Sequence, residues 1–213
     1  MEDTSQLAGR WMLLCERRGI GAAAARVRGT ALLSAYSQPH RYYHTPEHLR
    51  ECLDMLDGLD GLDARDRELV ELGIWFHDAV YDPKAVDNEE KSAELAERWL
   101  SDQDKDAASE VGVLVRATAG HLVPEAPGRV AAMLDIDLSI LGSDSRRYDE
   151  YSEQVREEYG HVSESVFVAG RRAVLMGFLE RDTIYLRPDV REKFESRART
   201  NLGRELAELS RRG

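Results

Sequence analysis

A His-Asp pair, His77-Asp78, ends an apolar stretch that runs from Leu72 to Phe76. Neighbouring side chains on a helix point about 100° apart, so a single partner seldom contacts both. A metal ion at the end of a helix is one of the few partners that can use both side chains. Imidazole and carboxylate groups are ligands for divalent transition metals. A metal ion with open coordination positions carries out hydrolysis or oxygen chemistry, and the pair therefore predicts a metal centre.

Two further histidines, His44 and His48, lie upstream on either side of Thr45-Pro46. Thr45 is a predicted helix N-cap, and Pro46 suits the first helical position, where its missing N–H costs nothing. His44 is then expected on the incoming loop and His48 in the first turn of the helix. We expect His48 to be a metal ligand and His44 to be a general acid that leans over the site. Two surface histidines at a helix start are the alternative interpretation, which the His-Asp pair disfavours.

Two aspartates, Asp135 and Asp137, lie within an apolar helix predicted over residues 129–141. A buried carboxylate is costly unless it is paired or binds a metal. Residues two apart on a helix point roughly 160° away from each other, so one ion cannot readily use both. Asp137 is the predicted metal ligand. Asp135 is expected either to hold a ligand histidine by its other ring N–H or to be solvated.

The chain has 213 residues, enough for one domain with a sizeable core. Helix-forming residues and capping signals predict a single all-α domain, a helical bundle over residues 1–213. We expect a metal-binding core at about 40–142, with the C-terminal helices of 145–210 packed on it. The predicted helices cover 4–18, 22–36, 46–56, 63–78, 87–100, 107–119, 129–141, 145–159, 163–180 and 188–209.

The net charge of −11 and the sequence pI of about 5.1 argue against a general nucleic-acid binder, which would have a basic face. No apolar run approaches the roughly 20 residues that span a bilayer, so no membrane association is expected. Cys15 and Cys52 are too few for a disulfide framework, and both are predicted to be reduced core thiols. The acidic first residues do not resemble a signal peptide, and we expect a cytoplasmic protein of undetermined oligomeric state.

Four motifs of the chain resemble those of the HD-domain metal-dependent phosphohydrolases, and most closely a bacterial subgroup of predicted HD phosphohydrolases. The four are a Tyr-His-x-x-x-His motif, a Trp-Phe-His-Asp-x-Val-Tyr-Asp motif, an Asp-Asn-Glu motif and an Asp-x-Asp-Leu motif. The likeness covers most of the chain from about residue 40. The motifs stand at residues 43–48, 75–82, 87–93 and 135–142.

This resemblance implies an HD-type helical domain that hydrolyses a small phosphate ester, such as a nucleotide. It implies that one divalent ion (Mn, Fe, Co, Ni, Zn or Mg) binds to His48, His77, Asp78 and Asp137. Asp78 would also orient the attacking water while bridging to a second ion. The first motif is similar, too, to that of cyclic-nucleotide phosphodiesterase catalytic domains, which implies that His44 is the proton donor. The chain lacks most of that scaffold, so cyclic nucleotides do not follow as substrates.

Four more residues are candidates for binding the phosphorylated substrate. His121 follows Gly120 in a loop, where it could contact a phosphate or a second ion. Asp82 would line the mouth of the site, although an Asp before Pro83 is also typical of a turn. Two arginines could neutralise a phosphate through their forked donors, although each could equally be a solvated surface residue. These arginines are Arg171 and Arg199.

Two other functions are compatible with the same residues. A di-iron oxygenase would need further histidines between the His-Asp pair and Asp137, and only His121 lies there. A second ion would then hold mainly water, which suits hydrolysis better than a stable iron pair. A non-catalytic sensor of a nucleotide or a metal is the other alternative. All four predicted ligand positions are filled, so nothing indicates a degenerate site.

Overall fold

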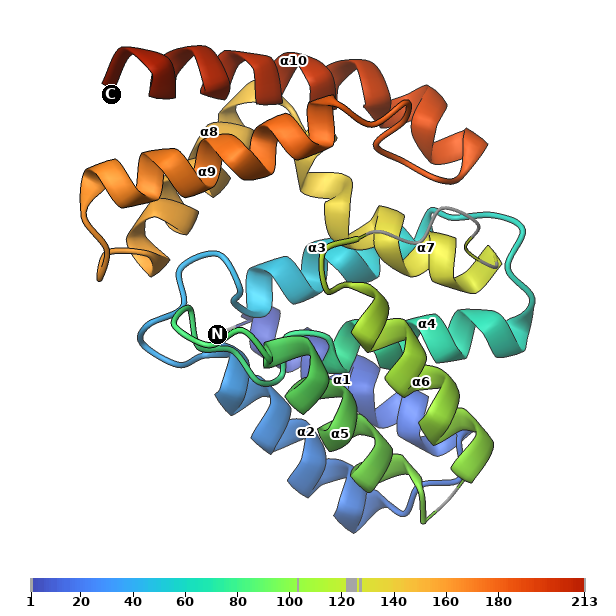
Figure 1. Ribbon diagram of the computed structural model, residues 1–213. Helices are drawn as coiled ribbons and strands as arrows, with labels where there is room; N and C mark the ends of the chain where they lie inside the picture. The colour runs from blue at the N-terminus through green and yellow to red at the C-terminus, as the bar shows by residue number, and fades with distance from the viewer. Residues whose placement is uncertain (1, 103, 122–125, 127, 213) are drawn as a thin grey trace. The chain divides into compact units, whose positions relative to one another are not determined.

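The computed structural model describes residues 2–102, 104–121, 126 and 128–212, and within these ranges every regular element is a helix (Figure 1). The predicted all-α fold class is confirmed. No helix in the described ranges is both long and apolar enough to cross a membrane. The elements are α1 (Glu2–Arg17), α2 (Ala22–Tyr36), α3 (Pro46–Asp57), α4 (Ala64–Phe76), α5 (Asn88–Leu100), α6 (Lys105–Ala117), α7 (Gly128–Asp137), the 3₁₀ helix η1 (Leu138–Gly142), α8 (Ser145–Glu158), α9 (Glu164–Leu179) and α10 (Pro188–Arg212).

The chain forms two compact units, which divide within α7. The first unit comprises residues 1–133 and contains α1 to α6 and the start of α7. The second comprises residues 134–213 and contains the end of α7, η1 and α8 to α10. The single domain with C-terminal helices packed on a metal-binding core stays a prediction.

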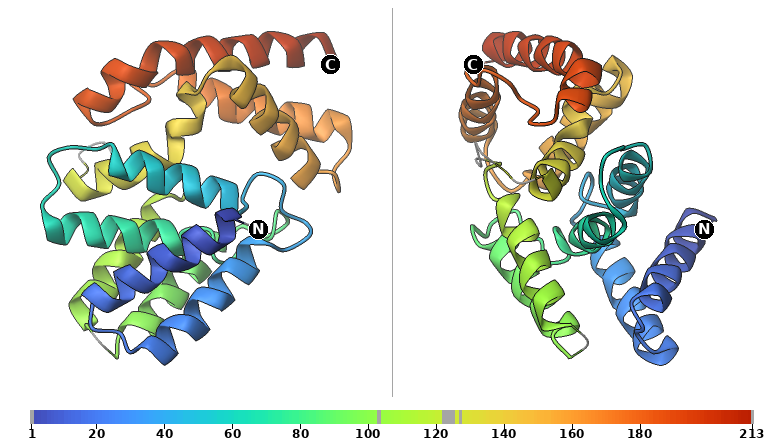
Figure 2. Two further views of the ribbon diagram at one scale, coloured as in Figure 1. Left: turned by 180° about the vertical axis from the view of Figure 1, so that it is seen from behind. Right: turned by 90° about the vertical axis from the view of Figure 1, so that its right-hand side faces the viewer.

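Helix α4 is the central element of the first unit, where it packs against α3, α5 and α6. Its C-terminal half is buried on every side, from Leu69 to Phe76. This explains why residues 72–76 form a continuous apolar run rather than an amphipathic pattern, while the buried Glu71 is paired with Arg10 and Arg17. Gly73 leaves room for Met133, because an added Cβ would lie 3.2 Å from its sulfur, and α6 is in ordinary contact range, with Leu114 Cβ at 3.4 Å. The paired helices α1–α2 and α5–α6 flank this centre (Figure 2).

Helix boundaries follow the predicted caps closely, but not every cap makes its side-chain hydrogen bond. Asp63 accepts a 2.8 Å hydrogen bond from the Asp66 backbone N–H, as an N-cap should. Thr45 stands at the N-cap of α3 without a side-chain capping bond, so Pro46 alone marks that helix start. Asp87 likewise makes no capping bond and instead pairs with Lys91, 2.8 Å away.

The predicted helix over residues 129–141 ends earlier than expected. The α-helical part stops at Asp137, and the backbone tightens into the 3₁₀ turn of η1. Within the second unit, η1 packs against α8 and α10, and α9 packs on α10. The tighter winding places Asp137 at a helix terminus instead of in a helix interior.

Candidate metal centre

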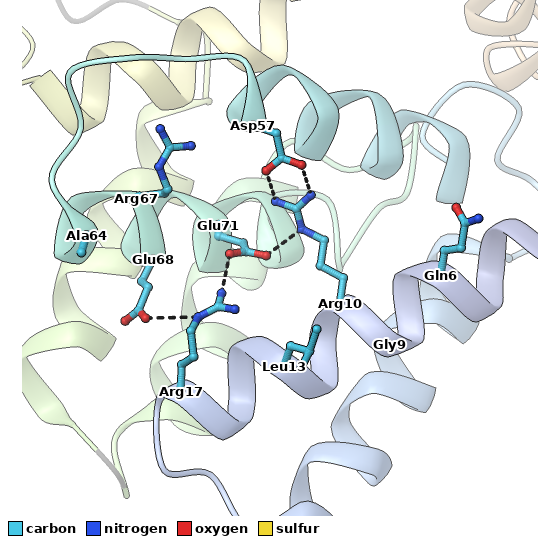
Figure 3. A pocket seen from close by; sticks show the side chains of 10 residues that line it. All are labelled: Gln6, Gly9, Arg10, Leu13, Arg17, Asp57, Ala64, Arg67, Glu68 and Glu71. Atoms are coloured by element: carbon cyan, nitrogen blue, oxygen red, sulfur yellow. Dashed lines mark hydrogen bonds and ion pairs between the residues drawn. The ribbon is translucent and has the colours of Figure 1, made fainter.

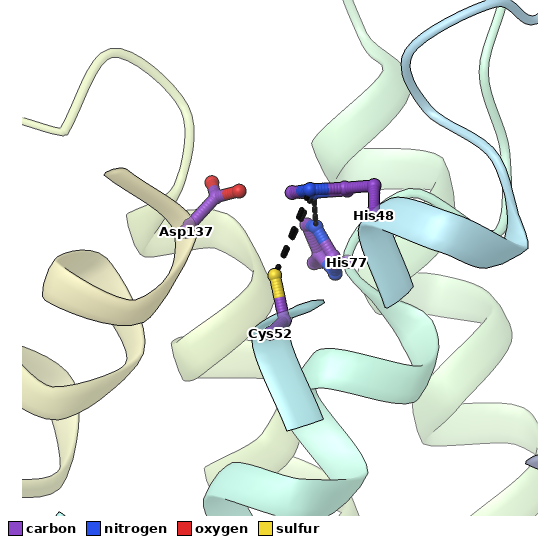
Figure 4. A group of neighbouring side chains, drawn as sticks. All are labelled: His48, Cys52, His77 and Asp137. Carbon is purple, nitrogen blue, oxygen red and sulfur yellow. Dashed lines mark hydrogen bonds between the residues drawn. The ribbon is translucent and has the colours of Figure 1, made fainter. Parts of the chain in front are cut away.

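Two histidines of the first unit meet side by side, each placed by the end of a helix. His48 lies in the first turn of α3, and His77 directly follows the last residue of α4. Their Nε2 atoms are 3.0 Å apart, and both residues are almost completely buried (Figure 4). Because α3 packs against α4, the predicted association of these two motifs is observed.

The backbone of α4 fixes which ring nitrogen of His77 is available. His77 Nδ1 lies 2.8 Å from the Ile74 carbonyl oxygen, which can only accept a hydrogen bond, so Nδ1 carries the proton. In the neutral ring, Nε2 then presents a lone pair toward His48. A carbonyl that holds the distal ring nitrogen is the usual support of a metal-binding histidine. Two ring nitrogens this close to each other need a proton or a metal ion between them.

The Asp78 carboxylate adds an oxygen to the same point. Its Oδ2 atom lies 3.0 Å from His77 Nε2 and 3.6 Å from His48 Nε2. The Asp78 side chain is 14 % exposed, so this edge of the cluster is open to solvent. Two imidazoles and one carboxylate therefore converge. The adjacent side chains of His77 and Asp78 point to the same place, whereas neighbours in a regular helix would point about 100° apart.

Cys52 is a member of the cluster that the sequence interpretation assigned only to the core. It is buried as predicted, but its Sγ atom lies 3.7 Å from Nδ1 and 3.8 Å from Nε2 of His48. One potential ligand atom from each of His48, Cys52 and His77 lies within 4.8 Å of the others. The signal that could have identified Cys52 is its spacing, because residues i and i+4 share one helix face.

Asp137, the predicted ligand downstream, is the last residue of α7. His48, Cys52, His77 and Asp137 together have the residue types that can hold a metal ion. Asp137 belongs to the second unit, whereas the other three belong to the first.

His44 lies at the rim of the cluster, on the loop before Pro46, as expected. Its ring centroid is 5.9 Å from that of His48, and the ring is packed against Tyr81 at 4.2 Å. The residue is half-buried, so solvent and a ligand can reach it. His44 is close enough to act on a group bound at the histidines.

Arg41 is a buried residue of this region that the sequence interpretation did not identify. Its guanidinium donates hydrogen bonds to three backbone carbonyls, those of His44 (3.2 Å), Asp78 (2.7 Å) and Ala79 (3.4 Å). It also lies over the ring of Tyr81, 5.2 Å from the centroid. One cation therefore connects the loop that carries His44 to the turn that carries the His-Asp pair.

The expectations for Asp135 need correction. The residue is fully buried, so it is not solvated, and its two oxygens accept hydrogen bonds from the backbone N–H groups of Leu186 (2.8 Å) and Arg187 (2.7 Å). Burial raises the pKa of this carboxyl to about 6, although both backbone donors and the Arg187 charge act to lower it. Asp135 thus anchors the loop before α10 inside the second unit. The supporting bond to His77 comes from Ile74 instead.

The two candidate substrate-binding arginines have partners within the second unit. Buried Arg171 donates to both carboxylate oxygens of Glu205, at 2.8 and 3.0 Å. Arg199 donates to Glu195 and, at 2.8 Å, to the Arg181 carbonyl near the end of α9. These contacts give both arginines a structural explanation, and their role toward a substrate stays a prediction.

The other two substrate candidates lie in loops of the first unit. Asp82 is exposed, and its Oδ1 accepts a 2.9 Å hydrogen bond from the Lys84 backbone N–H, as in an Asx turn. His121 is half-buried and has a left-handed backbone with φ of 52°, which is unusual for a residue other than glycine. Both stay predictions as substrate contacts.

An open pocket of about 720 Å³ lies elsewhere on the first unit, between α1, α3 and α4 (Figure 3). At its floor, the buried Glu71 carboxylate accepts from Arg10 Nε at 2.7 Å and from Arg17 at 3.0 Å. Arg10 also forms two hydrogen bonds to Asp57. None of the residues that line this pocket belongs to the histidine cluster, and its charges are largely paired with one another.

Comparisons with known proteins add no family assignment. Neither a protein-family model, nor a curated protein, nor a solved structure matches the chain.

Proposed function

We propose that the protein is a metal-dependent phosphohydrolase of the HD-domain type, acting on a small phosphate ester. The observation that carries the proposal is the convergence of His48 Nε2, His77 Nε2 and Asp78 Oδ2 within 3.0 to 3.6 Å of one another. The sequence motifs around these residues, which resemble those of HD phosphohydrolases, support the same function.

The residues fit a divalent metal ion. Two buried imidazoles with one Nε2 lone pair fixed by Ile74, plus an adjacent carboxylate, form a nitrogen and oxygen donor set typical of transition metals. Asp137 is proposed as a further ligand, because the sequence motif predicts this role and the residue stands at the end of α7. A bound ion would supply Lewis acidity at a phosphoryl oxygen and would lower the pKa of a water.

The side chains around the cluster have separate roles in the proposed hydrolysis. Asp78, the most exposed of the three converging groups, orients a water by accepting its hydrogen bond. His44 holds a proton at the rim and donates it to the leaving oxygen of the substrate. Arg41 keeps both residues in register through its hydrogen bonds to their backbone carbonyls.

Elemental analysis of the purified protein, followed by phosphate-release assays over nucleotides and sugar phosphates with each metal, tests this function. His48→Ala, His77→Ala, Asp78→Ala and Asp137→Ala should each lose metal and activity together. Asp135→Ala should keep at least part of the metal, and His161→Ala, which removes an exposed histidine of the second unit, should keep all of it. Full occupancy in Asp137→Ala combined with loss in Asp135→Ala would show that the ligand assignment is wrong.

A further inference from the structure

We propose that Cys52 is a metal ligand and that its sulfur makes the centre selective for thiophilic divalent ions. These ions are zinc, cobalt, nickel and iron, as opposed to magnesium and manganese. The inference rests on the metal centre of the proposed function and adds the property that determines which ion the centre accepts. The motifs that resemble HD phosphohydrolases assign no role to this residue.

The position of Cys52 on α3 is the first argument. His48 and Cys52 are four residues apart on one helix, so their side chains leave the same face one above the other. Both are buried, with exposed fractions of 2 % each. The helix backbone therefore keeps the thiol and the imidazole as neighbours on one buried face.

The spacing of the donor atoms is the second argument. Cys52 Sγ is 3.8 Å from His48 Nε2. A sulfur and a nitrogen bound to one tetrahedral zinc ion, with bonds of about 2.3 and 2.1 Å, lie about 3.6 Å from each other. The separation from Nε2 is close to that of two ligands of one ion, and ligand atoms of His48, Cys52 and His77 all lie within 4.8 Å of one another, while Sγ is equally near Nδ1, at 3.7 Å. A thiol that merely packs under an imidazole ring is the competing explanation.

Ligand softness gives the predicted consequence. A centre made only of imidazole and carboxylate groups accepts manganese and, with more oxygen ligands, magnesium. A thiolate favours zinc, cobalt, nickel and iron, and it disfavours hard cations that require oxygen. As the bond from sulfur to the metal forms, the thiol proton is released to solvent.

Titration of the full-length protein with cobalt(II) tests the sulfur ligand directly, because a thiolate bound to cobalt(II) absorbs in the near ultraviolet. The band should appear in the wild type and in Cys15→Ala, which removes the other buried thiol, on α1. It should be absent from Cys52→Ala and from the near-isosteric Cys52→Ser. A wild-type protein without the band, or a Cys52→Ser protein that keeps it, would overturn the inference, as would failure to bind cobalt.

A competition experiment on the same proteins measures selectivity. The preference for zinc over manganese should fall at least about tenfold in Cys52→Ser, the smallest loss typical when a group that supports a metal site is removed. An unchanged preference contradicts the inference.

Phosphate release separates this inference from the proposed function. Cobalt that binds with the band but without any hydrolysis would leave Cys52 a ligand and reject the phosphohydrolase, whereas hydrolysis without the band would do the opposite.

Discussion

Arg41 Nη1 donates a 2.7 Å hydrogen bond to the backbone carbonyl of Asp78, and the same nitrogen donates to the carbonyl of His44 at 3.2 Å. The guanidinium thus occupies the position of a C-terminal cap just beyond α4, where a cation also interacts favourably with the helix dipole. Its rigid fork reaches several carbonyls at once, which a lysine ammonium on a flexible stem does not. The relationship makes Arg41 a positioning residue, because it holds the backbone that carries the His44 and Asp78 side chains.

Arg41→Lys is expected to lower kcat about 10- to 100-fold while the protein keeps its metal, because small misplacements of catalytic groups have effects of this size. A displaced His44 should also make kcat depend more steeply on the leaving group, which loss of stability alone would not do. Steady-state kinetics with a series of aryl and alkyl phosphates, together with metal analysis, measure both effects.

The matched control for this prediction is Arg67→Lys. Arg67 also donates to a backbone carbonyl at the end of a helix, that of Leu56 at 2.7 Å, but it lines the separate pocket of Figure 3. This variant should lose a similar amount of stability without any change in leaving-group dependence. Equal kinetic profiles for the two variants would show that Arg41 has no positioning role.

His44→Ala should keep the metal and lose turnover by about 10²- to 10⁴-fold, the contribution typical of a general acid. The reason is its place at the rim, 5.9 Å between ring centroids from His48 and outside the converging donor atoms. The loss should shrink for aryl phosphates, whose leaving groups need no proton. An equal loss with good and poor leaving groups would rule out the proton-donor role, and His40→Ala, on the same loop, serves as the control.

The sequence predicted the helices well because the signals that end them are local. Gly58 and Gly142 mark helix ends, and Pro46 and Pro188 mark starts, without help from tertiary structure. The convergence of His48 with His77 was also predictable, since both histidines belong to the motifs at residues 43–48 and 75–82 that predict one metal site. The 3₁₀ turn after Asp137 was not predictable, because a single tight turn at the end of a helix leaves no distinct pattern of apolar residues.

Three contacts could not be predicted from the sequence, for a different reason. Cys52 reads as an ordinary core residue, because burial of a thiol is common whether or not it lies beside a ligand. Arg41 acts through backbone carbonyls, which leave no mark in residue types. Asp135 holds the backbone of Leu186 and Arg187, some 50 residues away along the chain, so no local pattern could reveal its partner.

The buried pair of Arg171 and Glu205 predicts an acid-sensitive second unit. Burial alone would raise the Glu205 pKa, but the hydrogen bonds and charge of Arg171 outweigh it and hold the pKa below its ordinary value of 4.5. A carboxyl whose pKa is lowered in the folded state contributes stability above the unfolded value, and this contribution is lost as pH falls through the folded value. Glu205→Gln should cost about 3–5 kcal/mol at neutral pH, with a difference from wild type that shrinks below pH 4.5.

Urea unfolding between pH 3 and pH 7 measures this effect, with Glu208→Gln on the same helix as a control that should change little. The same pair of variants bears on Arg171 as a substrate contact. A purely structural Arg171 predicts that Glu205→Gln leaves KM unchanged at temperatures where the protein is folded. An increase in KM without any loss of stability would instead favour the substrate-binding prediction.

The reaction class distinguishes hydrolysis from the oxygenase alternative. Among residues 79–136, His121 is the single histidine, and it lies in a loop after α6, so a second ion would have few protein ligands. We expect metal-dependent phosphate release under strictly anaerobic conditions, without any consumption of oxygen. Cobalt or nickel should support it about as well as iron, because hydrolysis requires a Lewis acid and no redox change. An oxygenase predicts activity only with iron and only in air. A purified protein with two irons that consumes oxygen and releases no phosphate would reject the phosphohydrolase and leave the all-α fold unaffected.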